Sequence, residues 1–171
     1  MITENEKEVY NFLRQIQNYD GDQIDSNRIT ITDKWPESIF DLVFLLGEDQ
    51  DMKDTLIQKL ENEQSEKCII AVSCDSIPLG DIQKRAIRPQ QIIGVNWCVP
   101  AHTTFFLEIV KSPITEDQVS KKIKSLAVSY WQKDPYIIEG QLGIRSKLLA
   151  ALIREAFHIV EEGYASAKDV D

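Results

Sequence analysis

The spacing of apolar residues along this chain changes repeatedly between a helical period and strand-like runs. In residues 3–19 the apolar side chains recur every three or four residues, at Val9, Phe12, Leu13 and Ile16. Thr3 and Glu6 have the spacing of a capping box at the start of this segment. An amphipathic helix is therefore predicted over residues 3–19.

A short strand and then a strand–helix–strand unit are predicted next. After a turn at Asp20–Asp22, residues 28–32 (RITIT) alternate apolar and polar side chains, which is typical of a half-exposed strand. Residues 41–46 and 67–73 are continuous apolar runs of strand length. The segment between them has an apolar side chain every four residues, at Met52, Leu56 and Leu60. These three segments predict a βαβ unit.

The same alternation continues to the end of the chain. Strands are predicted over residues 91–99, 104–110 and 135–140. The helix before the last strand is expected to open at Thr115, with Gln118 three residues on, and to turn inward Val119, Ile123, Leu126, Ala127 and Tyr130. A final helix over residues 145–162 is expected to end at Gly163, which suits a left-handed C-cap. Its apolar stripe consists of Leu149, Leu152, Ile153, Ala156 and Val160.

Alternating strands and helices define the predicted fold class as α/β, with a doubly wound, mostly parallel sheet and an appended C-terminal helix. The chain has 171 residues, of which 43% are apolar and 27% charged, a composition typical of one compact globular domain. Internal repeats and low-complexity linkers are absent from the sequence.

Charge and hydropathy narrow the expected partners. The 19 basic and 28 acidic residues give a net charge of −9, which disfavours binding to nucleic acid or to an anionic membrane. No apolar run approaches the ~20 residues that a membrane-spanning helix needs. The N-terminal segment lacks the basic-then-apolar order of a signal peptide, so a cytoplasmic protein is expected.

Cysteine and histidine usage gives no support to a metal site. Cys68, Cys74 and Cys98 lack metal-ligand spacing, and buried reduced thiols are the expected reading. His102 and His158 are the two histidines of the chain, too few and too isolated to predict a zinc centre.

The sequence also lacks the turn that a doubly wound sheet uses to bind dinucleotides. Neither a G-x-G-x-x-G nor a G-x-x-x-x-G-K-S/T motif occurs, and the seven glycines are dispersed. A pyrophosphate needs backbone N–H groups brought close by small residues at a helix N-terminus. No bound cofactor is therefore predicted.

Five successive segments nevertheless resemble one family in the correct order. They are RITIT, DLVFLLGEDQDMKDTLIQKL, CIIAVSCDSIPLGDI, RPQQIIGVNWCVPAHTTFFLEIV and LLAALIREAFHIVEEGYASAKDVD, and together they run from Arg28 to Asp171. This chain is similar to the 3-hydroxyacyl-CoA dehydrogenases, which oxidise 3-hydroxyacyl-CoA with NAD in fatty-acid metabolism. The closing segment EEGYASAKDVD is the most specific match.

The resemblance places Asn96 where the family has its catalytic histidine, in the segment that corresponds to Gly-x-His-Phe-Phe-Asn-Pro. A carboxamide does not titrate, so Asn96 could bind a substrate oxygen but could not accept a proton. Glu108, twelve residues on, matches the glutamate of the family's His/Glu pair. His102 is a weaker candidate for a substitute base. A purely structural reading is also open, in which Asn96 satisfies backbone groups at a strand end and Glu108 pairs with a lysine.

Two further family positions have changed their residue type. The Asn-Thr-Ser turn near the family's substrate corresponds to Ser73–Asp75, and its Asn-Arg pair to Ser146 and Lys147. Ser73 and Ser146 are therefore the candidate substrate-binding residues. Glu48 and Lys53 also match family positions, and are read as a helix-start acid and a surface lysine.

The resemblance implies a truncated Rossmann-like domain over residues 1–142 and the start of the family's helical dimerisation region over residues 143–171. Only 27 residues precede RITIT, so the glycine-rich first βα unit and both strands that bind NAD in the family are expected to be missing. Met1 and the capping box favour a natural start, and a fragment of a longer protein is the open alternative.

Two functions are consistent with this pattern. The favoured hypothesis is a degenerate dehydrogenase that has lost NAD binding and catalysis and acts as a binding or assembly module, with acyl-CoA as a candidate ligand. The alternative is an active oxidoreductase of 3-hydroxyacyl-CoA, with a partner chain supplying the NAD-binding half and Glu108 or His102 serving the chemistry.

Association is predicted from two unsatisfied surfaces. Without the family's first strand, residues 42–46 have unpaired backbone groups along one edge, unless RITIT or another subunit pairs there. The last helix, including Phe157, has an apolar face wider than a reduced sheet can cover. A homodimer is expected.

Overall fold

The computed structural model describes residues 34–47, 49–101 and 103–171. The chain divides into two compact units, residues 1–38 and residues 39–171, and the second contains all the elements discussed below. The helix predicted over residues 3–19 and the strand predicted over residues 28–32 lie outside the described residues, as do Glu48 and His102.

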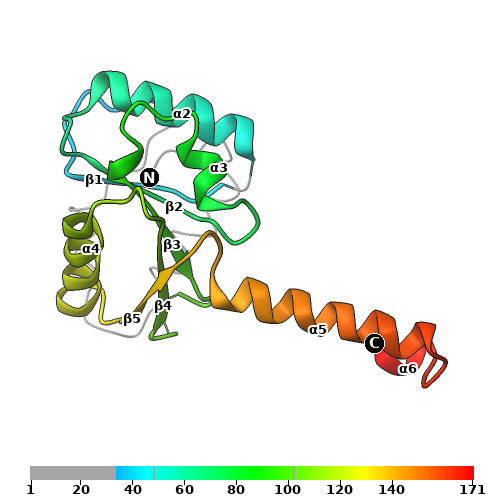
Figure 1. Ribbon diagram of the computed structural model, residues 1–171. Coiled ribbons are helices and arrows are strands. Elements are labelled where there is room, and N and C mark those ends of the chain that lie inside the picture. The colour runs from blue at the N-terminus through cyan, green and yellow to red at the C-terminus, as the bar shows by residue number, and fades with distance from the viewer. Residues whose placement is uncertain (1–33, 48, 102) are drawn as a thin grey trace. The chain divides into compact units, whose positions relative to one another are not determined.

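Strands and helices alternate through the second unit (Figure 1). In chain order they are β1 Leu42–Leu45, α2 Gln50–Glu63, β2 Ile69–Val72, α3 Leu79–Gln83, the 3-10 turn η2 Pro89–Gln91, β3 Ile92–Trp97, β4 Phe106–Lys111, α4 Asp117–Ser129, β5 Asp134–Glu139, α5 Ile144–Glu161 and α6 Ala167–Val170. The helix and strand segments predicted between residues 41 and 162 are all present, and α3, η2 and α6 are additions.

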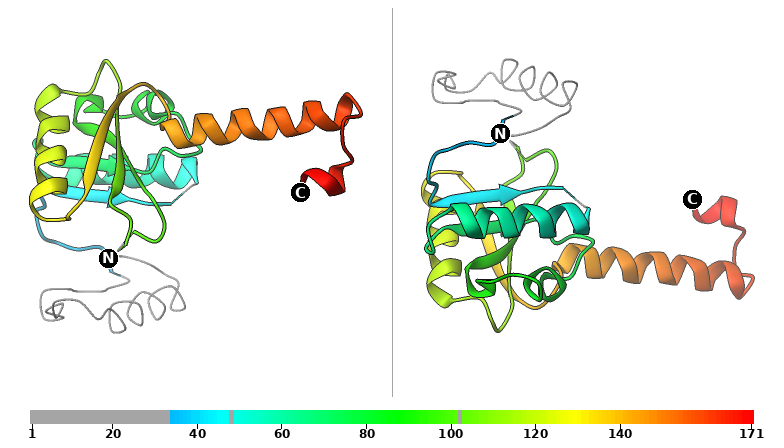
Figure 2. Two further views of the ribbon diagram at one scale, coloured as in Figure 1. Left: turned by 90° about the horizontal axis from the view of Figure 1, so that it is seen from below. Right: turned by 90° about the horizontal axis from the view of Figure 1, so that it is seen from above.

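The described strands form one mostly parallel sheet in the order β1-β2-β3-β4-β5. β1, β2 and β3 run parallel, as do β4 and β5, while β3 and β4 are antiparallel. Helix α4 covers one face, and α2 and α3 lie on the other (Figures 1 and 2). The α/β, doubly wound fold class is thus confirmed, and β1-α2-β2 is the predicted βαβ unit.

The core under α4 comes from alternate positions of the strands. Inward side chains of β2, β3 and β4 pack against the buried face of α4. The strands contribute Ile69, Ala71, Ile93, Val95, Leu107 and Ile109, and α4 contributes Val119, Ile123 and Ala127. Phe44, Trp97 and Trp131 close this cluster with ring centroids 5.5–5.9 Å apart. Since strand side chains alternate between faces, Gly94, Asn96 and Glu108 lie on the opposite face.

The start of α4 differs from the prediction. The N-cap residue is Glu116, and the Thr115 hydroxyl instead donates to the Ile92 carbonyl at 3.0 Å. Thr115 is therefore used to join the end of β4 to the start of β3. Tyr130, expected to point inward, is 78% exposed because α4 ends one residue before it.

Helix α5 forms where the sequence predicted it, and Gly163 follows it with φ of +75°, the left-handed conformation expected of its C-cap. Its apolar stripe is not covered, however. Leu149, Leu152 and Phe157 are 58–67% exposed, and no residue of α5 is buried. The helix leaves the sheet at its N-terminal end and extends away from it (Figure 1).

β1 is an edge strand of the sheet formed by the described residues. Its far edge is where the sequence predicted unpaired backbone groups. The strand expected to pair there lies outside the described residues, so that pairing stays a prediction. In the described part of the chain, no helix is long and apolar enough to cross a membrane.

The core under α4 makes a prediction about stability. Ile123 is fully buried and Val128, on the same helix, is 56% exposed. Replacement of Ile123 by Ala should lower the free energy of unfolding by about 2–5 kcal/mol, because it removes buried methyl groups and leaves a cavity. Val128→Ala should change it by less than about 0.5 kcal/mol. Urea denaturation measures both, and equal losses would contradict this packing.

Candidate functional site

Asn96 and Glu108 lie directly opposite each other in the sheet. They are register partners of the antiparallel strands β3 and β4, and each is completely buried. Cross-strand partners project from the same face, so the two side chains meet on the side away from α4. The structure therefore brings together the two residues that the sequence resemblance matched to the family's His/Glu pair.

The Asn96 carboxamide is held by the loop that follows β2. The Cys74 backbone N–H donates to Asn96 Oδ1 at 2.9 Å, and the Cys74 thiol lies 3.4 Å from the same oxygen. This fixes the orientation of the amide, so its Nδ2 points to Glu108 Oε2 at 3.5 Å. These contacts agree with the structural role considered for Asn96, in which its side chain satisfies a backbone group.

The Glu108 carboxylate lies at the N-terminus of α5. Its Oε1 accepts a hydrogen bond from the Arg145 backbone N–H at 3.0 Å, one of the helix-start donors that have no partner within a helix. Pairing of Glu108 with a lysine, the expected structural role, is not what the structure shows. A carboxylate at this position also interacts favourably with the helix dipole.

Gly143, the N-cap residue of α5, closes over both side chains. A Cβ atom added to Gly143 would overlap Glu108 Oε2 and would lie 2.8 Å from Asn96 Nδ2. A side chain at this position would have to displace the Glu108 carboxylate. Gly143 was not among the residues predicted from the sequence, where its one signal is a small residue just before a helix.

Ser146 and Ser73 occupy different surroundings. Ser146, in the first turn of α5, donates to Asp75 Oδ1 at 3.5 Å and so lies near the Asn96–Glu108 pair. Ser73 instead faces β1 and α2, where Lys53 Nζ donates to its carbonyl at 2.6 Å and lies 3.3 Å from its hydroxyl. The structure thus groups Asn96, Glu108 and Ser146, while Ser73 belongs to a separate polar contact.

The reading of Lys53 as a surface residue is wrong. Lys53 is 2% exposed, and its ammonium group bonds to Ser73 across the end of the βαβ unit. Its partner is 20 residues away in the sequence, so local pattern could not reveal the burial. His158 is a surface residue as expected, with its ring 3.5 Å from the Glu161 carboxylate.

The buried cysteines are poor nucleophiles. Burial raises the pKa of the Cys74 thiol to about 12, and burial also raises the pKa of Cys68. Thiols react as thiolates, so Cys74 stays neutral and unreactive at physiological pH. Its unfolded pKa is lower, so the stability that it contributes is complete below about pH 9 and is lost as the pH rises towards 12.

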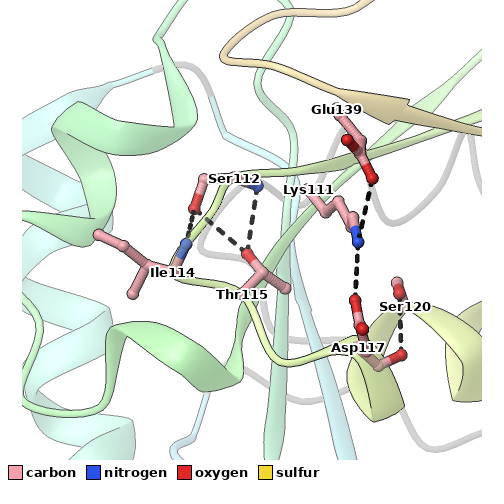
Figure 3. Close-up of polar contacts among 7 residues, drawn as sticks. All are labelled: Lys111, Ser112, Ile114, Thr115, Asp117, Ser120 and Glu139. Atoms are coloured by element: carbon pink, nitrogen blue, oxygen red, sulfur yellow. Dashed lines mark hydrogen bonds and ion pairs between the residues drawn. The ribbon is translucent and has the colours of Figure 1, made fainter.

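A pocket of about 380 Å³ lies at the other end of β4 (Figure 3). Lys111 spans it, 2.7 Å from Asp117 and 3.3 Å from Glu139, and these contacts raise the pKa of Lys111 and lower that of Asp117. Beside it, the Ser112 hydroxyl accepts from the Ile114 N–H at 3.1 Å. None of Asn96, Glu108, Ser73 and Ser146 lines this pocket.

Comparison with known proteins identifies the class of this fold and site. The family model for the NAD-binding domain of 3-hydroxyacyl-CoA dehydrogenases matches residues 10–140. The match covers most of the chain, and this protein therefore belongs to that family. The match begins at residue 10, upstream of Arg28, where the resemblance read from the sequence begins. The division into regions 1–142 and 143–171 stays a prediction.

Individual relatives are longer than this chain. The fatty acid oxidation complex subunit alpha of Vibrio parahaemolyticus is 26% identical over 114 residues, which are 66% of this chain and 16% of that protein. A 3-hydroxyacyl-CoA dehydrogenase from Archaeoglobus fulgidus has the same fold, with 24% identity, a TM-score of 0.79, and coverage of 98% of this chain and 56% of its own.

A second solved structure, FadB2 of M. tuberculosis, is 20% identical with a TM-score of 0.77, covering 96% of this chain and 61% of its own. The chain thus spans between about a sixth and three fifths of the length of these three relatives.

The family name implies NAD, but the residues at the Asn96–Glu108 pair do not fit a nicotinamide ring. Neither side chain has exposed surface. Asn96 Oδ1 and both Glu108 oxygens face donors of the chain itself. Even a methyl group on Gly143 would overlap the carboxylate, so no ring can lie against it in this arrangement.

The close packing at Gly143 makes a prediction with a matched control. Gly143→Ala should lower the free energy of unfolding by about 1–3 kcal/mol, because the new methyl group displaces Glu108. Gly140→Ala, three residues earlier, should have little effect, since the nearest atom to its added Cβ is 3.9 Å away. Denaturation of both variants measures the difference.

The same experiment in a Glu108→Ala background tests the cause. Removal of the carboxylate opens the space that the new methyl group needs, so the cost of Gly143→Ala should shrink there. An undiminished cost would show that Glu108 is not the group displaced.

Proposed function

We propose that this chain is a non-catalytic member of the dehydrogenase family that acts as an assembly module and forms a homodimer through α5. The observation that carries this proposal is that Asn96 and Glu108 are both fully buried and are bonded to backbone groups of the chain itself. Removal of a hydride from a hydroxyl-bearing carbon releases a proton, and the group that accepts it must titrate and must reach the substrate.

Asn96 fails both requirements in this arrangement. Its carboxamide cannot take up a proton, and it is fully buried with its oxygen bonded to the Cys74 backbone. Glu108 can titrate, but it is equally buried and is bonded to the start of α5. The glycine-rich turn that cradles a pyrophosphate is also absent from the sequence. These features support a scaffold without dehydrogenase chemistry.

The stripe on α5 supports the assembly role. Large apolar side chains remain exposed along it, namely Ile144, Leu148, Leu149, Leu152, Ile153 and Phe157. The helix has 18 residues and is about 27 Å long, so the stripe forms a long apolar surface of the kind that marks interaction sites. Burial of such surface stabilises association by about 25 cal/mol per Å² before the costs of ordering.

Charge along α5 favours a second copy as the partner. Among the exposed charged residues on the side of the stripe, Arg145 lies at its N-terminal end and Glu162 at its C-terminal end. Two copies packed antiparallel through the stripe would place the basic end of each helix beside the acidic end of the other. A two-fold axis makes such an interface self-complementary.

The second candidate function is an active oxidoreductase that needs a partner chain for the NAD-binding half. The family match over residues 10–140 and the names of the relatives support it. Acyl-CoA binding is compatible with either function.

Absence of turnover is the first prediction of the proposal. The protein, mixed with NADH and acetoacetyl-CoA, should not oxidise NADH above the blank, because Asn96 cannot titrate and the buried Glu108 cannot reach the substrate. The variant Asn96→His should also be inactive, since the ring has no access past Gly143. A full-length active family member serves as the positive control. Turnover that disappears in Glu108→Ala would contradict the proposal and support the oxidoreductase.

Self-association is the second prediction. Sedimentation at tens of micromolar should give twice the 19.6 kDa monomer mass. Leu152→Glu should weaken the dimer at least about tenfold, which corresponds to about 1.4 kcal/mol, because it buries a charge in the stripe. Arg154→Glu, an exposed charge reversal on the opposite side of α5, should leave it nearly unchanged. A monomeric wild type would refute the assembly role.

A further inference from the structure

The hydrogen bonds around Glu108 run in one direction. The Cys74 N–H donates to Asn96 Oδ1, Asn96 Nδ2 faces Glu108 Oε2, and the Arg145 N–H donates to Glu108 Oε1. A backbone N–H is always a donor, so both ends of this chain of contacts are fixed. Position 108 must then offer two acceptors, which a carboxylate supplies and a carboxamide does not.

These contacts hold the first turn of α5 on the sheet. Arg145 is the second residue of α5, and Ser146, the third, reaches Asp75 at 3.5 Å. The loop before the helix is held as well, since the Leu79 N–H donates to the Gln141 carbonyl at 2.8 Å and the Gly80 N–H to its side chain at 2.5 Å. We call this attached segment, from Gln141 to Ser146, the root of α5. Beyond the root, no residue of α5 is buried.

A helix attached only at its root takes its direction from the contacts at that root. Most of the apolar stripe, from Leu148 onward, lies beyond this first turn, so the direction of α5 decides where the stripe lies relative to the sheet. In this first turn, Arg145 is the residue that bonds to a side chain of β3 or β4, and that side chain is Glu108.

We infer that Glu108, with Asn96, is the positioning residue of α5: the buried pair at the family's catalytic positions sets the direction of the apolar stripe and thereby the affinity of the chain for a second copy. This inference rests on the proposed homodimer. It gives the buried carboxylate at position 108 a structural role, in place of the catalytic role that the resemblance implies for it.

The test uses a donor–acceptor swap. In Glu108→Gln, one oxygen is replaced by an amide group, and a donor then faces either Asn96 Nδ2 or the Arg145 N–H. The first turn of α5 should loosen. In the double variant Asn96→Asp with Glu108→Gln, the new carboxylate at position 96 accepts from the Cys74 N–H and from the new amide at position 108. The amide oxygen at position 108 then accepts from the Arg145 N–H. The full set of contacts returns, with the same net charge and nearly the same volume.

Two measurements are made on the full chain. Sedimentation gives the dimer dissociation constant, and amide hydrogen exchange gives the protection of the Arg145 N–H; circular dichroism confirms that each variant is folded. Glu108→Gln should weaken the dimer at least tenfold and speed exchange at Arg145, and the double variant should restore both. Glu139→Gln, a carboxylate of β5 with an exposed side chain, is the matched control and should change neither.

Unchanged dimer affinity in Glu108→Gln would overturn the inference. Failure of the double variant to restore affinity would also overturn it, since charge at position 108, and not the directed contacts, would then be responsible. If the wild type is monomeric, the proposed assembly fails. The exchange arm then decides the inference alone: faster exchange at Arg145 that the swap reverses supports the anchor, and unchanged exchange refutes it.

Discussion

The hydrogen bond between the Arg145 backbone and the Glu108 carboxylate joins the sheet to the helix that follows it. A buried carboxylate is costly unless donors surround it, and Glu108 finds them in the N-terminus of α5 and in the Asn96 amide. Asn96 is oriented in turn by the Cys74 backbone. Three separate segments, the loop after β2, the β3–β4 pair and the root of α5, are therefore held by one directed set of contacts.

That arrangement links the family's chemistry to the function proposed for this chain. By the resemblance in the sequence, these two positions correspond to the His/Glu pair of the 3-hydroxyacyl-CoA dehydrogenases, a pair that can titrate. Here a carboxamide replaces the imidazole, and the helix start closes over both side chains with Gly143 as the contact residue. The hydrogen-bonding capacity of Asn96 and Glu108 is directed to the protein itself.

Sequence patterns predicted most of the described fold because the strong signals are local. The buried run of β2, the four-residue repeat of α2 and the glycine after α5 each act within one element. Strand direction is not encoded locally, so the antiparallel β3–β4 pair was not foreseen, and α3 is too short to show a period. The capping role expected of Thr115 failed because its hydroxyl bonds to Ile92, which is distant in the sequence.

The candidate site was predictable only in part for the same reason. The family resemblance identified Asn96, Glu108 and Ser146, which the fold brings to one place. Ser73 was named with them but faces Lys53, and the burial of Lys53 depends on that long-range contact. Gly143 and the Arg145 backbone are inconspicuous in the sequence, since their importance arises from how closely α5 approaches the sheet.

Calorimetric titration with NADH tests the central claim, that the pair is committed to holding the helix and is closed to a nicotinamide. The account predicts no saturable binding of NADH up to about 1 mM, the upper end of ordinary KM values. Saturable NADH binding that weakens in Glu108→Gln would contradict it, because the coenzyme would then have to reach the buried carboxylate.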